Sequence, residues 1–197
     1  MAVRLTRAEQ VERNRELVLD AARRVFLDQG YVGARLEAIA EEAGFSKGVV
    51  YSQFAGKADL FLALLERRIA ERAELNARVA AEHAGIEGLR ALLVANTRRE
   101  AEDGWARLLI EFRVAAARAP EVNARYAALH TRTLERFSEA IAAILARGGL
   151  VPVHPAPVLA GLVMTLASGR VLEIAAGTTP VDVEVVVDLL SRLVEPA

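Results

Sequence analysis

Apolar residues recur along this chain with the spacing of one face of an α-helix. In the segment 6–29 they stand at positions 18, 21, 22, 25 and 26, which is an i, i+3, i+4, i+7, i+8 pattern. Glycines, prolines and N-capping residues separate successive segments of this kind. The pattern predicts nine helices, over residues 6–29, 36–43, 46–54, 57–82, 86–102, 104–118, 120–147, 155–176 and 180–195.

One segment, the valine-rich stretch 181–187, is also compatible with a strand. The helical spacing continues after it, so we expect a helix there. The residues that continue it are Val186, Leu189, Leu190 and Leu193. Thr179 and Asp182 have the spacing of a capping box at its start. The predicted fold class is therefore all-α.

Composition narrows the class of protein. The chain has 197 residues, 53% hydrophobic and 26% charged, as in an ordinary folded soluble protein. It has no cysteine, which excludes disulfides, thiolate metal sites and cysteine nucleophiles. No uninterrupted apolar run approaches the roughly 18 residues of a membrane span, and no secretory signal is visible at the start. We expect a cytoplasmic protein without a membrane partner.

The balance of charge does not by itself indicate a nucleic-acid partner, because the net charge is −1. The placement of the basic residues is more informative. The two lysines of the chain, Lys47 and Lys57, bracket one short segment. Four arginines crowd the N-terminus: Arg4, Arg7, Arg13 and Arg15.

That short segment has the pattern of a helix-turn-helix. Two short predicted helices flank the turn 43–46, in which Gly44 permits a tight reversal, and the second helix could enter a major groove. The residues expected to pack inward are Leu36, Ile39, Ala40, Val50 and Phe54. The residues expected to face outward as a DNA-reading surface are Lys47, Gly48, Val49, Tyr51, Ser52 and Gln53.

Three stretches here closely resemble the TetR family of DNA-binding transcriptional regulators. They are residues 18–31 (VLDAARRVFLDQGY), residues 39–51 (IAEEAGFSKGVVY), and Phe54 followed by Lys57 and Leu60. The resemblance implies that Ser46 caps the recognition helix and meets a phosphate, and that Lys47 and Gly48 approach bases. It also implies that Tyr51 and Lys57 contact backbone phosphates.

Four positions depart from the family pattern. Arg35 stands where Thr or Ser usually caps the second helix, and it could reach a phosphate instead. Val49 replaces a usual Thr and could touch a thymine methyl. Gln53 and Gly56 stand where His and Ser are common. These differences concern which operator is read rather than whether DNA is bound.

Two domains follow from this interpretation. Residues 1–60 form the three-helix helix-turn-helix DNA-binding domain, and residues 61–197 form a larger helical ligand-binding and dimerisation domain. Bulky side chains of the larger domain could line a cavity for a small, lipophilic or aromatic effector. The candidates are Trp105, Phe112, Tyr126, His130, Phe137 and Met164. Ordinary core packing explains each of them equally well.

The last two helices have the residues of a helix–helix interface between two copies. Small residues would allow close approach on one helix, and an apolar stripe lies on the other. The candidate interface residues are Gly161, Thr165, Ser168, Gly169, Val186, Leu189, Leu190 and Leu193.

The sequence contains no clustered catalytic set, no metal-ligand spacing and no phosphate loop, so we expect neither an enzyme nor a cofactor. The predicted function is a transcriptional regulator, more often a repressor in this family. It would bind a palindromic double-stranded DNA operator as a homodimer and respond to a small molecule. The alternatives are an all-helical enzyme and a helical interaction protein without DNA binding.

Overall fold

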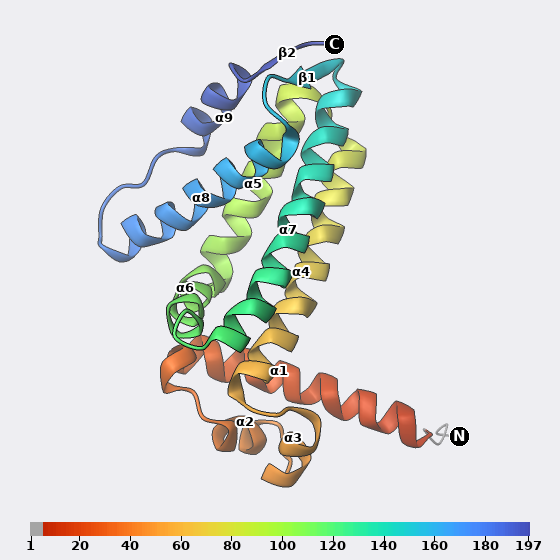
Figure 1. Cartoon of the computed structure of the whole chain (residues 1–197), viewed down its shortest axis with the longest axis vertical. Coiled ribbons are helices and arrows are strands. Elements are labelled where there is room, and N and C mark those ends of the chain that lie inside the picture. The colour runs from red at the N-terminus through yellow and green to blue at the C-terminus, as the bar shows by residue number, and fades with distance from the viewer. Residues whose placement is uncertain (1–5) are drawn as a thin grey trace. The chain divides into compact units, whose positions relative to one another are not determined.

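The computed structural model describes residues 6–197, with the side chains of residues 99–103 excepted. Over these residues the chain is almost entirely helical, with one pair of short strands, which confirms the all-α prediction (Figure 1). The elements in chain order are α1 (Arg7–Gly33), α2 (Leu36–Glu42), α3 (Lys47–Gln53), α4 (Lys57–Glu82), α5 (Gly85–Asp103), α6 (Trp105–Ala116), α7 (Pro120–Arg147), β1 (Leu150–Pro152), α8 (Ala156–Ala175), α9 (Val183–Ser191) and β2 (Val194–Pro196).

The end of the chain differs from the sequence prediction. The predicted helix 180–195 is shorter, because Asp182 rather than Thr179 is the N-cap and its carboxylate accepts the Glu184 N–H. After Ser191 the chain turns and forms β2, which pairs antiparallel with β1 in the register Val151 opposite Glu195. A strand of three residues is too short to show alternation, so only the partner strand determines it.

The first helix also extends beyond its predicted end. Gly30 has φ 71° and ψ 169°, which breaks the helical path where the sequence predicts a stop. One further turn follows, and the Ala34 N–H donates to the Gly30 carbonyl at 3.2 Å. Residues 30–34, here called the α1 exit segment, therefore form a bent connection that leads directly into α2.

The chain folds into two compact units. The first comprises Met1–Arg68 and Glu111–Tyr126, and the second comprises Ile69–Ile110 and Ala127–Ala197. The boundary cuts through α4, α6 and α7. This division by packing differs from the functional boundary at residue 60 that the sequence suggests, and that functional boundary stays a prediction.

The second unit has one apolar core, built where α4, α5, α7, α8 and α9 meet. Its fully buried side chains include Leu92, Ile144 and Leu145. α5 packs against α9, and Arg90 of α5 forms an ion pair with Glu184 of α9. Arg147, at the end of α7, donates to the Ala80 carbonyl at 3.1 Å and so satisfies an unpaired acceptor of the last turn of α4.

Two glycines of the second unit allow two connections to touch. A Cβ on Gly148 would lie 2.4 Å from the Cα and 2.6 Å from the N of Gly85. Gly85 itself has φ 59°, a conformation that favours glycine. The α4–α5 connection and the end of α7 can therefore approach this closely because Gly148 has no side chain.

We expect Gly148→Ala to lower the free energy of unfolding by about 1–3 kcal/mol, because a backbone neighbour cannot yield as a side chain can. Thermal and urea unfolding monitored by circular dichroism would measure the change. Gly33→Ala is the control, since its Cβ would meet only the Gln29 Cβ at 3.8 Å. Equal stability of the Gly148 variant and the wild type would contradict this account.

Candidate nucleic-acid interface

The helix-turn-helix is formed by α2, α3 and the turn between them. Gly44 has φ 72°, and the Phe45 N–H donates to the Ala40 carbonyl at 2.9 Å, which closes the end of α2. The predicted inward residues are buried, with Ile39 and Val50 at 0% exposure and Phe54 at 1%. Arg15 of α1 lies over the Phe54 ring, 4.6 Å from its centroid. The local scaffold is thus rigidly packed.

The outer face of α3 carries most of the predicted DNA-reading residues. Tyr51 is 52% exposed. Four others are also exposed: Ser46, Lys47, Gly48 and Ser52. Val49 and Gln53 are half-buried, and the Gln53 Oε1 is buried with no hydrogen-bond partner among the described residues. The Ser52 hydroxyl donates to the Val49 carbonyl at 2.8 Å.

Capping of the two short helices differs in part from expectation. Ser46 occupies the N-cap of α3, as the sequence predicts, but its side chain makes no capping hydrogen bond. Arg35 occupies the N-cap of α2 without a side-chain bond, in agreement with its inability to cap. Both side chains are exposed. Of the N-terminal arginines, Arg7 and Arg13 are exposed, and Arg4 lies outside the described residues.

Lys47, the one cation on α3, is paired within the helix-turn-helix. Its ammonium donates to Glu37 Oε1 of α2 at 3.2 Å, and both side chains remain largely exposed. A backbone hydrogen bond of Glu37 and the Lys47 contact together lower the pKa of the Glu37 carboxyl. This carboxylate therefore competes with any phosphate or base for the Lys47 ammonium.

Lys57 has a role that the sequence does not reveal. Its ammonium donates to the carbonyls of Tyr31 at 2.8 Å, Val32 at 3.0 Å and Ala34 at 3.0 Å. These bonds use all three N–H donors of the side chain. The ammonium also lies 4.9 Å from the centroid of the Tyr31 ring. Burial lowers the pKa of Lys57. A phosphate would have to displace one of the carbonyls to bind it.

An aromatic cluster forms the core beneath the α1 exit segment. Phe61 and Phe112 stack with centroids 4.3 Å apart, and Tyr31 meets each of them edge-on. Tyr126 meets Phe112 edge-on at 5.8 Å. Burial raises the pKa of Tyr126, and Arg113 opposes the shift. Phe112 and Tyr126, predicted to line an effector cavity, therefore both pack in the unit that carries the helix-turn-helix.

The N-terminus of α4 is fixed by an acidic side chain. Asp59 accepts the Ala55 N–H at 3.1 Å and pairs with Arg125 of α7 at 2.6 Å. Burial raises the pKa of Asp59, but the Arg125 and Ala55 hydrogen bonds outweigh it, so the pKa lies below its ordinary value. The carboxylate thus holds α7, α4 and the turn before α4 together.

The other four predicted effector residues lie in the second unit. Trp105 is 3% and Phe137 is 7% exposed, Met164 is partly buried against the same core as Phe137, and His130 is half-buried. The structure also reveals a buried polar pair. The Asn96 amide donates to Asn76 Oδ1 at 2.9 Å, and Arg72 donates to Asn96 Oδ1. Asn76, which the sequence interpretation missed, could have been recognised as a polar residue three positions before the buried Val79.

Comparison with known proteins decides the family. Residues 18–64 match the family described as bacterial regulatory proteins, tetR family. Residues 85–196, more than half of the chain, match the C-terminal domain of BetI-type transcriptional repressors. This chain belongs to the TetR family. It is a transcriptional regulator with the family's helix-turn-helix and C-terminal domain, and the family consists of regulators rather than enzymes.

Individual relatives agree with this assignment. The HTH-type transcriptional repressor AcnR of Corynebacterium diphtheriae is 29% identical over 189 residues, covering 94% of this chain and 93% of AcnR. A TetR-family transcriptional regulator from Mesorhizobium loti has the same fold, with a TM-score of 0.71 and 20% identity over 95% of this chain and 94% of its own. A SmeT–triclosan complex has a TM-score of 0.67 and 23% identity, over 92% and 91% of the two chains.

In this TetR-family chain, α8 and α9 expose an apolar surface, here called the α8–α9 face. Its exposed large residues include Val158, Leu162, Leu166, Leu172, Val185 and Leu189. Of the predicted interface residues, Thr165, Gly169 and Leu189 are exposed and Gly161, Ser168, Val186 and Leu193 are half-buried. Leu190 is 3% exposed and belongs to the core of its own unit.

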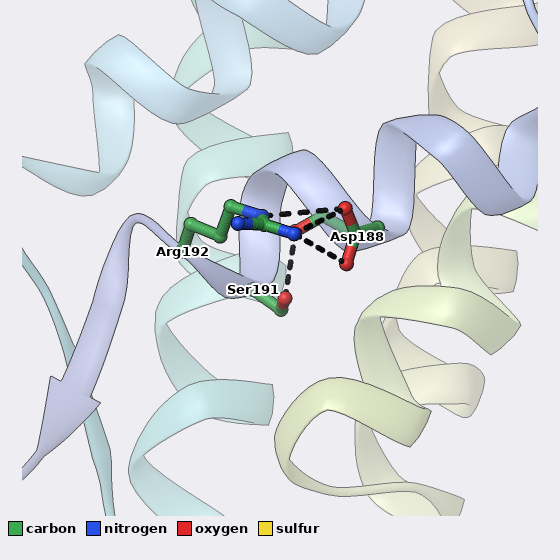
Figure 2. Close-up of polar contacts among 3 residues, drawn as sticks. All are labelled: Asp188, Ser191 and Arg192. Carbon is green, nitrogen blue, oxygen red and sulfur yellow. Dashed lines mark hydrogen bonds and ion pairs between the residues drawn. The ribbon is translucent and has the colours of Figure 1, made fainter.

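A polar edge borders this face on α9. Arg192 forms an ion pair with Asp188 at 3.1 Å, one turn earlier, and the Ser191 hydroxyl donates to the Asp188 carbonyl at 2.7 Å (Figure 2). Both charged side chains are more than half exposed. Helical spacing places Asp188 and Arg192 beside Val185 and Leu189.

Within the described part of the chain, α8 passes a length and composition test for a membrane span. Its mean hydropathy is 1.6, and 17% of the apolar stretch is buried in the protein. The described part of the chain, taken as a whole, contains no group of three or more His, Asp or Glu side chains that could hold a metal ion.

The Lys47–Glu37 pair generates a prediction about DNA affinity. We expect Glu37→Gln to tighten DNA binding roughly two- to fivefold at low salt, because an exposed ion pair of up to about 1 kcal/mol no longer competes with phosphate. A mobility-shift titration would measure it. Glu41→Gln on the same helix is the control, since Glu41 is also exposed. An equal gain in both variants would reduce the effect to net charge and contradict the specific competition.

Proposed function

We propose that this TetR-family chain is a repressor that binds a palindromic operator as a homodimer and is released by a small lipophilic or aromatic effector. The observation that carries the proposal is the exposed outer face of α3, held on a helix-turn-helix whose inner residues are buried. A short helix with this exposure fits a major groove. AcnR, which matches over nearly its full length, is a transcriptional repressor by name.

Each exposed residue has a role in this proposal. Lys47 and Gly48 approach base edges, and the half-buried Val49 offers a methyl contact to thymine. Ser46, Tyr51 and Arg35 contact phosphates, which fix the register without reading sequence. Ser52 and Gln53 complete the reading face. The arginines of the N-terminal arm add phosphate contacts from the start of α1.

A second copy of the chain is the proposed partner of the α8–α9 face. A soluble monomer rarely exposes so many large apolar side chains on two neighbouring elements of the chain. The bordering Asp188–Arg192 pair supplies the polar rim that protein interfaces usually have, whereas a lipid-buried helix would not place such charges beside its apolar stripe. A twofold axis at this face would set two α3 helices about 34–36 Å apart, or a multiple of that spacing. This arrangement is consistent with a cytoplasmic protein.

The effector proposal concerns the second unit. SmeT, a structural neighbour, forms a complex with triclosan, a small molecule. The proposed lining here is Trp105, His130, Phe137 and Met164, which all belong to this unit. Phe112 and Tyr126 belong to the aromatic cluster of the first unit and are not part of the proposed lining. The Asn76–Asn96 pair would add a polar contact that distinguishes effectors able to form hydrogen bonds. A preference of about 1–3 kcal/mol for one conformation suffices for a 5–150-fold change in operator affinity.

DNA recognition is tested with operators selected by the wild-type protein from random duplexes. We expect the selected sites to be palindromic. Tyr51→Phe should weaken binding to all duplexes alike, because a phosphate contact carries no sequence information. Val49→Thr should instead change which site is preferred. Mobility-shift titrations would measure both, and unchanged binding by a Lys47→Ala, Tyr51→Phe double variant would contradict the assignment.

Dimerisation is tested at Leu189 rather than Leu190, because Leu190 is part of the protomer core. Leu189→Glu is expected to convert a dimer to a folded monomer with at least tenfold weaker operator binding, since it places a charge in a buried interface. Analytical ultracentrifugation at micromolar concentration would measure the mass. Val114→Glu, at an exposed apolar position of α6, is the control. A monomeric wild type, or one that floats with lipid vesicles, would overturn the dimer.

A further inference from the structure

We propose that Glu111 and Lys57 are positioning residues that hold the α1 exit segment from two sides and thereby set the orientation of the helix-turn-helix. This inference rests on the proposed operator binding through α3. It concerns the contacts that set the orientation of α3 for that binding. It assigns Glu111, on α6, as a residue that fixes the segment leading into the DNA-binding helices.

The first contact is between Glu111 and the backbone just after the bend. Glu111 Oε2 accepts the Tyr31 N–H at 2.9 Å. The same oxygen lies 2.5 Å from where a Cβ of Gly30 would stand, so the carboxylate occupies the space that the glycine leaves open. A charged acceptor on a backbone amide makes one of the stronger hydrogen bonds in proteins.

The second contact is the set of three Lys57 hydrogen bonds to the carbonyls of the same segment. The last carbonyls of a helix lack partners within the helix and carry partial negative charge, which a cation stabilises. Glu111 therefore holds the N–H side of the α1 exit segment, and Lys57 holds its carbonyl side. Opposite charges therefore bind the two kinds of polar group of one short piece of backbone.

The segment between these two side chains leads directly to the DNA-reading helices. Ala34 is 1% exposed, Arg35 is the N-cap of α2, and Leu36 is buried. The Tyr31 ring packs on Phe61 of α4 and Phe112 of α6. The α1 exit segment therefore cannot shift without a change in these ring contacts. Residues 30–34 thus connect the position of α4 and α6 to the start of the helix-turn-helix.

Glu111 and Lys57 both lie on helices that cross the boundary between the two units. α6 begins at Trp105 in the second unit and carries Glu111 at the point where the first unit begins. A shift of α6 along or about its axis changes the position of the carboxylate relative to Tyr31. The hydrogen bond to the Tyr31 amide converts that shift into a movement of the segment that precedes α2.

The test compares side chains that separate length from charge at position 111. In the full-length protein, with operators selected by the wild type, Glu111→Asp keeps the charge and shortens the side chain by one methylene. Glu111→Gln keeps the length and an acceptor oxygen. If position matters, Glu111→Asp loses operator affinity, roughly tenfold for one lost charge-assisted hydrogen bond, and Glu111→Gln loses less. Glu121→Ala, at an exposed acidic residue of α7 in the same unit, is the control and keeps wild-type affinity.

Lys57→Met distinguishes positioning from phosphate contact. A lost phosphate contact lowers the slope of log affinity against log salt by about one, whereas a lost positioning contact weakens binding with the slope unchanged. The exchange rate of the Tyr31 amide, measured by hydrogen–deuterium exchange, should be at least tenfold higher in Glu111→Asp than in the wild type. The increase in Glu111→Gln should be smaller. This measurement does not need DNA, so it tests the Glu111–Tyr31 contact even if the wild type selects no operator.

Three results would overturn the proposal. The first is a salt slope reduced by about one in Lys57→Met. The second is greater loss of affinity in Glu111→Gln than in Glu111→Asp. The third is unaltered exchange at Tyr31 in Glu111→Asp. If Glu111→Asp fails to fold, Gly30→Ala, which forces the carboxylate away from the segment, must reproduce its affinity loss with an unchanged slope, and wild-type affinity would overturn the proposal.

Discussion

The backbone at the end of α1 needs partners for both its N–H and its carbonyl groups at a place where it is half-buried and bent. Buried backbone polar groups that lack partners cost free energy comparable to a lost hydrogen bond. Here the bend at Gly30 exposes the Tyr31 amide, and the end of the helix exposes three carbonyls. Two charged side chains from two other helices satisfy them, so the requirement for hydrogen bonding joins α1, α4 and α6 into one structure.

The aromatic cluster makes this arrangement rigid. Phe61 and Phe112 come from the same two helices as Lys57 and Glu111, and Tyr31 comes from the segment that both charges hold. Burial of the rings favours one packing, and edge-on contacts between rings favour particular geometries. Polar and apolar interactions therefore select the same position of the α1 exit segment. The helix-turn-helix takes its orientation from that position.

The second unit differs from the first in that two of its helices, α8 and α9, leave apolar side chains exposed. Its core is complete around Leu92, Ile144 and Leu145, yet α8 and α9 present further large side chains to solvent. A regulator that must place two recognition helices at a fixed spacing needs such a face on each copy. In the proposed homodimer, the same helices contribute to the protomer core on one side and to association on the other.

The sequence by itself determined that the helices exist and in what order, the helix-turn-helix, and most of the exposed face of α3, because these depend on local periodicity and on glycines at turns. It did not determine where the first and last helices end. It identified Tyr51 as exposed and Val50 and Phe54 as buried for the same reason. Only the tertiary structure decided which partner a given side chain contacts, because the partner lies on a segment distant in the sequence. Lys57 meets carbonyls of α1, Phe112 and Tyr126 join the cluster around Tyr31, and Leu190 packs inward while Leu189 faces out. The C-terminal strand exists only because residues 150–152 lie beside it, since three residues carry too little local preference to form one alone.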